Sequence, residues 1–239
     1  MKKHRLMVLG VSLLASLGVL SSGFAGWVIA ADPISKEGNG SISADYTVVT
    51  NGVESVTEKG KDGEVRFAAN GTTAGKNWLT ADKGAADLEA SFSYTVKLYD
   101  SSEAKTLSFS ELTFAENGTN GYAKAVESGV VGTLPTFVSV APSEKSTGYI
   151  LITANGANVT LADSNKSASV TLQSEKSLDV TFSIHFAWGT EFGGENPLDY
   201  FNSLDKDSTN VKKAQDAIAK LKDADGANFK LSFKVGVTA

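Results

Sequence analysis

The segment Leu178-Asp179-Val180-Thr181-Phe182-Ser183-Ile184-His185-Phe186-Ala187-Trp188 decides the fold, because its large apolar residues occupy every second position. The positions between them are small or polar. A period of two is that of a β-strand with one face on a core and the other in water. Leu88–Leu98 and Phe229–Thr238 alternate in the same way. The three segments predict long strands of a mainly antiparallel protein.

Shorter β-prone segments fill the rest of the chain, separated by turn dipeptides such as Asn51-Gly52 and Asn120-Gly121. They are Ile42–Thr50, Val53–Lys59, Glu64–Ala68, Thr106–Phe114, Phe137–Val140, Tyr149–Thr153, Asn158–Ala162 and Ala168–Leu172. Many strands with frequent turns predict an all-β fold, a two-sheet jelly-roll-like β-sandwich, formed by residues 31–239 as one domain. Within Thr106–Phe114 the apolar positions change parity, which predicts a β-bulge near Ser110-Glu111.

Residues 197–225 predict a helical insertion before the last strand. Pro197 to Asn202 can form a helical turn. Ser208 to Ala224 predicts a longer helix, with Ser208 as its N-cap and Gly226 as its stop. Its apolar stripe consists of Val211, Ala214, Ile218 and Leu221. We expect this helix to cover an open end or edge of the sandwich.

Residues 1–30 have the order of a secretory signal peptide: a positive start, an apolar stretch and small residues. Val28 and Ala30 occupy the positions that signal peptidases recognise, so we predict cleavage between Ala30 and Ala31, with Gly23-Phe24-Ala25 as the second candidate site. The alternative is an uncleaved membrane anchor, because Leu6 to Ala31 carries no charge and would span about 39 Å as a helix. Either way the sequence predicts a secreted or cell-surface protein.

The amino-acid composition argues against several classes of function. The chain has no cysteine, which excludes thiolate metal sites, disulfides and thiol catalysis. Its formal net charge is −5, and it is more acidic still without Lys2, Lys3 and Arg5 of the signal. Arg66 is the only other arginine. Nucleic acid is therefore an unfavourable partner, and a membrane is expected to bind only through an uncleaved N-terminal segment.

The residues that could carry catalysis are few. His185 is the only histidine after the signal and lies at a polar position of its strand, which predicts a solvated surface side chain. A zinc site needs three or four suitable ligands, and no metalloprotease motif is present. Asp205 and Asp207 begin like a calcium loop but lack its later glycine and glutamate. We predict no catalytic residue, no cofactor and no metal.

The segment from Trp188 to Asn202 is the most distinctive one in the chain, with four aromatics, three glycines and a proline. One interpretation is a plug that closes the sandwich, with the aromatic rings packed beneath the helix. The other is a ligand or partner surface, since such rings offer flat apolar faces to a sugar or peptide. The candidate surface residues are Trp188, Phe192, Tyr200 and Phe201.

The Gly23-Phe24-Ala25-Gly26-Trp27 sequence at the end of the apolar stretch resembles the signals of exported proteins of Bacilli and Clostridia processed by the SipW type of signal peptidase. The chain is thus similar to the TasA and camelysin family. The similarity is strong in the signal, and in the rest of the chain it concerns the architecture. The resemblance implies a jelly-roll sandwich at the cell surface or in a biofilm matrix. For the fibre-forming members it implies polymerisation by donation of an N-terminal strand. Camelysins are described as metalloproteases, but this sequence has no zinc motif to receive that activity.

Two functions follow as hypotheses. The first is a structural or matrix subunit, fibre-forming or adhesive, in which the flexible leader Lys36–Gly40 brings Ile42–Thr50 to a neighbouring copy for β-strand addition. In the simpler interpretation, Ile42–Thr50 is the first strand of its own sandwich. The second function is a carbohydrate- or peptide-binding module that uses the Trp188–Phe201 segment.

Overall fold

The computed structural model describes residues 38–48, 52–67, 88–99, 103–118, 121–173, 176–195, 197, 200, 203–205, 207–224 and 226–238. The predicted signal peptide, with Val28, Ala30 and Ala31, lies outside the described residues. Phe201 and most of the predicted helical turn from Pro197 also lie outside them.

Two mainly antiparallel sheets face each other, which confirms the predicted all-β sandwich. The first has the strand order β3-β1-β12-β5-β10-β9 and the second β2-β4-β11-β7-β6, with β8 paired to β7. The first sheet consists of β3 (Glu64–Phe67), β1 (Gly38–Val48), β12 (Ala227–Thr238), β5 (Lys105–Glu116), β10 (Ser167–Leu172) and β9 (Leu161–Ala162). The second consists of β2 (Val53–Asp62), β4 (Leu88–Leu98), β11 (Ser177–Phe186), β7 (Thr147–Ala154), β6 (Thr133–Phe137) and β8 (Ala157–Asn158).

Alternation along the strands builds the core between the sheets. β4 and β11 bury every second residue, as their sequences predict. The rings of Phe182 from β11 and Phe233 from β12 stack across the sandwich with centroids 4.6 Å apart. Tyr94 and Phe109 surround this pair with further edge-on contacts. Apolar burial of this extent accounts for a stable fold without disulfides.

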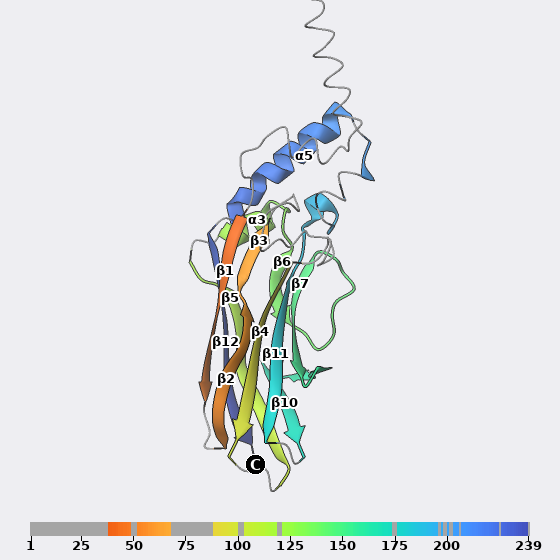
Figure 1. The fold of residues 1–239 in the computed structure, drawn as a ribbon. Helices are drawn as coiled ribbons and strands as arrows, with labels where there is room; N and C mark the ends of the chain where they lie inside the picture. Colours follow the sequence, from red (N-terminus) through yellow and green to blue (C-terminus); the bar gives the residue numbers. More distant parts are fainter. Residues whose placement is uncertain are drawn as a thin grey trace, which may run out of the picture.

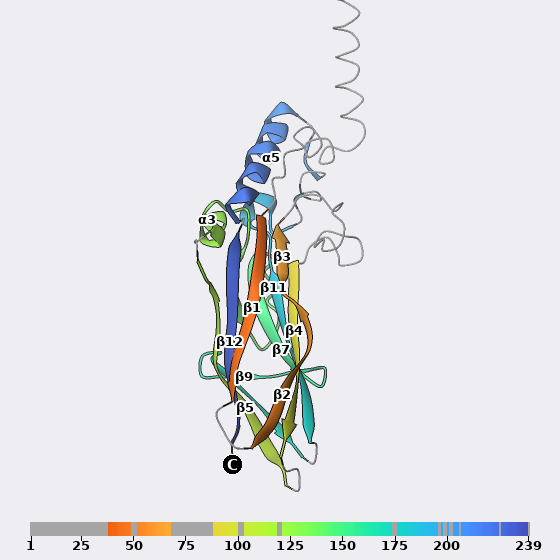
Figure 2. The same cartoon turned by 60° about the vertical axis from the view of Figure 1, so that its left-hand side comes forward.

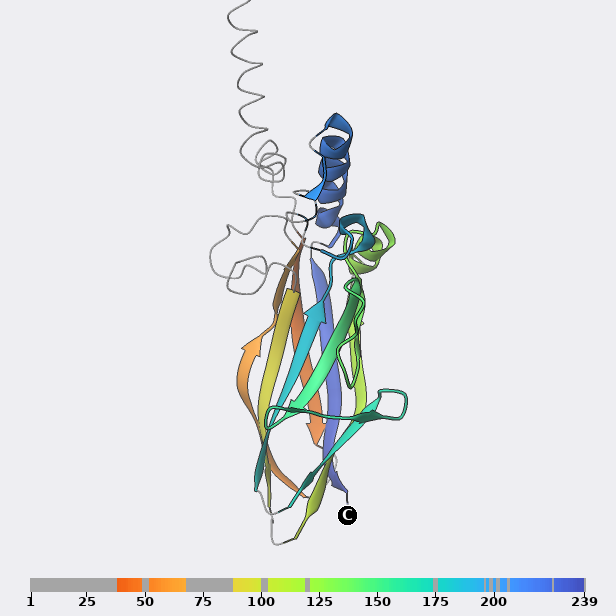
Figure 3. The same cartoon turned by 90° about the vertical axis from the view of Figure 1, so that its right-hand side faces the viewer.

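The helices gather at one end of the elongated sandwich, and the C-terminus lies at the other (Figure 1). They are α3 (Gly121–Glu127), the short η2 (Thr190–Phe192), α5 (Ser208–Lys220) and η3 (Leu221–Ala224), which continues α5 toward β12. Figure 3 shows β4, β11 and β7 of the second sheet side by side, with α5 beyond their upper end. The helical insertion thus lies at an end of the sandwich, as expected.

The first and last strands run parallel in this mainly antiparallel fold, as do β6 and β7. β1 pairs with β12 from Gly40 opposite Ala227 to Val48 opposite Val235. Figure 2 shows the two strands side by side, both starting at the helical end. In the single chain, β1 is therefore a strand of its own sandwich. The predicted flexible leader is wrong in its second half, because Gly38 to Gly40 already belong to β1.

Of three local features predicted from the sequence, the structure confirms the bulge in β5 and differs at one strand end and at the N-cap of α5. The predicted bulge in β5 is confirmed, because Glu111 has a positive φ of 51° and the pairing with β12 shifts register there. The predicted strand Phe137–Val140 is wrong beyond Phe137, and Val140 is instead an exposed loop residue. The α5 N-cap is Asp207 rather than Ser208, with its carboxylate accepting a 2.8 Å hydrogen bond from the Asn210 N–H.

Candidate functional site

The aromatic segment after β11 closes the helical end of the core. Trp188 and Phe192 are both fully buried, and their rings meet edge-on with centroids 5.8 Å apart. Trp188 also contacts Phe67 of β3. Neither ring can offer a face to a ligand, so the predicted ligand surface is wrong at Trp188 and Phe192. The plug interpretation holds for these two residues.

Backbone packing explains why glycines accompany these rings. A Cβ atom on Gly189 would lie 2.1 Å from the Gly129 carbonyl oxygen, so only glycine fits there. Val131 pairs with Trp188 through an isolated β-bridge beside this contact. The close approach places η2 against the loop after α3 and holds Phe192 beneath the end of the sandwich.

Tyr200 differs from the two buried rings. It is half-buried, and the Lys213 Nζ of α5 lies 5.9 Å from its ring centroid, a cation–π contact. The contact places Tyr200 against α5, as the plug interpretation predicts. Of the four candidate surface residues, Tyr200 alone is partly accessible among those that the structure describes.

His185 lies on the outer face of the second sheet, as its parity predicts, but it is not freely solvated. Its side chain is only 17% exposed. Its ring stacks on Tyr149 of β7 at 4.3 Å, and its Nδ1 lies 3.4 Å from the Glu89 carboxylate of β4. Within the described part of the chain, no three histidine, cysteine or acidic residues gather closely enough to hold a metal ion.

A rung of polar contacts crosses the outer face of the same sheet. The Asp179 carboxylate of β11 pairs with Lys59 of β2 and accepts a 2.7 Å hydrogen bond from the Thr95 hydroxyl of β4. Asn155, at the turn after β7, accepts a hydrogen bond from the Asp179 N–H and donates its own N–H to the Asp179 carbonyl. The hydrogen bond from Lys59 lowers the pKa of Asp179. The rung is exposed, and its geometry is that of a structural clamp.

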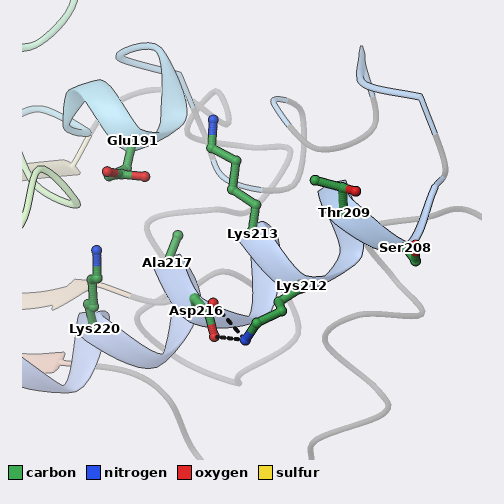
Figure 4. A pocket seen from close by; sticks show the side chains of 8 residues that line it. All are labelled: Glu191, Ser208, Thr209, Lys212, Lys213, Asp216, Ala217 and Lys220. Atoms are coloured by element: carbon green, nitrogen blue, oxygen red, sulfur yellow. Dashed lines mark hydrogen bonds and ion pairs between the residues drawn. The ribbon is translucent and has the colours of Figure 1, made fainter.

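An open depression of about 680 Å³ lies between η2 and α5 (Figure 4). Glu191 faces it from η2, and Lys213, Ala217 and Lys220 project toward it from α5. Lys212 points along the helix and pairs with Asp216. The lining carries both signs of charge and no nucleophile positioned by a base, so it defines no chemistry.

The open edge of β1 is the feature with the clearest capacity for interaction. β3 pairs with β1 only from Gly38 to Ser41, and Ile42 donates its N–H to the Gly63 carbonyl. Beyond Ile42, no described strand pairs with this side of β1. We define the β1 edge as residues 43–48. The amino-acid pattern predicts the strand but not its open edge, because the edge depends on where the next strand goes.

Tyr46 joins the two sheets across this opening. Its ring stacks on Phe233 at 5.8 Å and meets Tyr94 edge-on at 5.6 Å. Its hydroxyl donates to the Val56 carbonyl of β2 at 3.1 Å. Tyr46 is nevertheless 39% exposed, and Val48 below it is 43% exposed. Burial raises the pKa of Tyr94 to about 12, so this phenol stays neutral at the seam.

Comparison with known proteins gave no match: no family model, curated protein or solved structure is similar to this chain. Among the residues that the structure describes, no helix is long and apolar enough to cross a bilayer.

Proposed function

We propose that this protein is an exported structural subunit of the cell surface or extracellular matrix, and that it assembles with other copies by β-strand addition. The signal-like residues 1–30 support export. The observation that carries the assembly is the β1 edge, where no described strand pairs with the main-chain groups and where two large apolar side chains, Tyr46 and Val48, are partly exposed. An added strand would form hydrogen bonds with the main-chain groups and would also cover the apolar side chains.

The second hypothesis, a carbohydrate- or peptide-binding module, loses its main support. A sugar-binding platform needs at least one accessible aromatic face. Trp188 and Phe192 are fully buried, and Tyr200 is covered on one side by Lys213. The proposal therefore rests on the edge of the first sheet and assigns no catalytic activity.

Donation of the N-terminal strand stays a prediction. β1 pairs with β12 over nine positions of its own chain, from Gly40 to Val48. Donation to another copy would exchange this strand for its equivalent, so that each sandwich keeps the same contacts. Addition at the β1 edge needs no such exchange, because each copy retains its own β1.

Self-association of the exported protein tests the proposal. The full chain would be expressed in a Gram-positive host, purified as exported, and examined by sedimentation velocity over a wide concentration range and by electron microscopy. We expect species larger than the monomer that increase with concentration. A protein that stays monomeric at every concentration and forms no assemblies on cells would refute the proposal.

A further inference from the structure

We infer that two copies of this protein pair through their β1 edges as antiparallel strands, with Tyr46 opposite its counterpart in the second copy. This inference rests on the proposed function and specifies the junction between subunits. The partner is a second copy because the edge is complementary to itself in main-chain pattern, side-chain size and charge.

The main-chain groups of the edge point in a known direction. Ile42 donates its N–H to Gly63, on the side of β1 away from β12. Successive residues of a strand direct their N–H and C=O groups to opposite sides. The N–H and C=O groups of Ala44, Tyr46 and Val48 therefore point toward the open side, where no described strand pairs with them. A second strand can bind to all three residues.

Exposed apolar side chains distinguish the β1 edge from the other sheet edges. Four large apolar side chains are exposed among the described residues: Tyr46, Val48, Tyr99 and Val140. Tyr99 and Val140 follow the ends of strands, whereas Tyr46 and Val48 lie within β1 on its inward-facing side. An added strand would cover both with its own inward-facing residues.

The two edge strands of the second sheet, β2 and β6, carry features that discourage pairing. β2 has the charged residues Glu54, Glu58, Lys59 and Lys61 and two register shifts against β4. β6 contains Pro135 and pairs irregularly with β7. In natural proteins, charged side chains, β-bulges and prolines on an edge strand prevent it from pairing with a strand of another molecule. β10 has an open stretch of four residues, 169–172, but exposes no large apolar side chain there.

The register follows from the side chains. When Tyr46 faces its counterpart, Ala44 faces Val48 of the second copy, and each of these pairs can exchange two main-chain hydrogen bonds. Small Ala44 opposite larger Val48 leaves room for both Tyr46 rings. On the outer face, Asp45 faces Thr47 rather than a second Asp45, and Lys230 already neutralises Asp45 through a 2.7 Å ion pair. The register therefore sets no like charges opposite each other.

The contact is small, so association is expected to be weak in dilute solution. Five residues from each copy bury far less than the roughly 1,200 Å² of a stable interface. Crowding on a cell surface or in a matrix would favour the paired state, since tethering raises the effective concentration. A covalent trap is therefore the appropriate assay.

The absence of cysteine gives a clean background for disulfide trapping. Tyr46→Cys, in the full chain purified as exported, should form a disulfide-linked dimer under mild oxidation, because paired residues lie about 5.5 Å apart between Cα atoms. Tyr99→Cys is the matched control, since Tyr99 is the more exposed tyrosine at 66%. Random collision would crosslink Tyr99→Cys at least as well.

A mixture of two milder variants tests the register and does not disturb the Tyr46 ring. Ala44→Cys mixed with Val48→Cys should give the heterodimer. Neither variant alone should crosslink, because like residues would be offset by about 13 Å along the strands, beyond the ~7 Å limit for a disulfide.

A charge at the edge should weaken the pairing. Val48→Lys in the Ala44→Cys background, mixed with Val48→Cys, leaves one of the two Val48 positions charged. We expect the yield of trapped heterodimer to fall about tenfold, equivalent to ~1.4 kcal/mol. Val140→Lys, the same change at a 74% exposed loop residue, should leave the yield unchanged.

The outcomes separate the inference from the proposed function. Trapping at Tyr46 and in the mixture, with little at Tyr99, supports the inference. Larger species of the unmodified protein without these disulfides would overturn it and keep the proposed function, with strand exchange or another edge as the junction. Monomers throughout, with no disulfide, would overturn both.

Discussion

Replacing Phe182 by alanine should remove the centre of the core. Phe182 is fully buried and stacks on Phe233 at 4.6 Å, with Tyr94 and Phe109 edge-on around it. Truncation of such a phenylalanine costs about 3–5 kcal/mol of unfolding free energy, because contacts are lost and a cavity remains. With a urea m-value of about 2 kcal/mol/M, the unfolding midpoint should fall by about 2 M.

Urea unfolding followed by tryptophan fluorescence measures this effect, because Trp188 is buried in the same core. The matched control is Tyr99→Ala at an exposed loop, which should change stability by less than about 0.5 kcal/mol. Phe182→Ala combined with Phe233→Ala should cost less than the sum of the single changes, since the two rings contact each other. A loss below ~1 kcal/mol for Phe182→Ala would refute the inward parity of β11 and the stacked core built on it.

Three further predictions concern the N-terminus, the polar rung and the plug. N-terminal sequencing of the exported protein should begin at Ala31; an intact N-terminus in the membrane fraction would indicate an anchor instead. Because the folded pKa of Asp179 is lowered, its contribution to stability is complete above the unfolded value of 3.8 and is lost as pH falls through the folded value. Thermal unfolding from pH 6 to pH 2.5 should therefore show Asp179→Asn less stable than the parent at pH 6, with the difference shrinking toward the acid end; a constant difference would contradict the role of Lys59. Gly189→Ala should cost about 1–3 kcal/mol through its clash with Gly129, whereas Gly60→Ala, where a Cβ meets nothing within 4 Å, should show little change in calorimetry.

Alternation allowed most of the fold to be predicted from the sequence. β4 begins and ends where the pattern of Leu88–Leu98 does, and the change of parity in β5 located the bulge at Glu111. Both signals are local, since they record which face of one strand meets a core. Helix α3 has no such signal, because its seven residues are too few for a clear period. Its start is fixed from outside, by the Glu116 carboxylate of β5 accepting the N–H groups of Tyr122 and Ala123.

The local patterns could not predict which strands pair with each other or which side chains come into contact. Asn158–Ala162 has the composition of one strand, but it forms two short strands, β8 on β7 and β9 on β10, so this segment crosses from one sheet to the other. The same limit applied to the aromatic segment. Its residues indicated either a plug or a surface, and only the packing of Trp188 against Phe67 and Phe192 distinguishes them.

The β1 edge results from a single topological choice. After β1 the chain could have continued antiparallel in the same sheet, and a hairpin would have covered the whole edge of β1. Instead β2 pairs with β4 in the second sheet, and β3 returns to β1 only at Gly38 to Ser41. Among the described strands, the lower part of β1 therefore has no neighbour on this side, although its inward-facing residues have the pattern of a covered strand. Tyr46 closes part of the gap through its hydrogen bond to Val56, and Val48 remains partly exposed.

A sandwich that needed only to be stable could place a lysine at Val48, as natural edge strands often do. The apolar residues at this edge are what strand addition by a second copy would require.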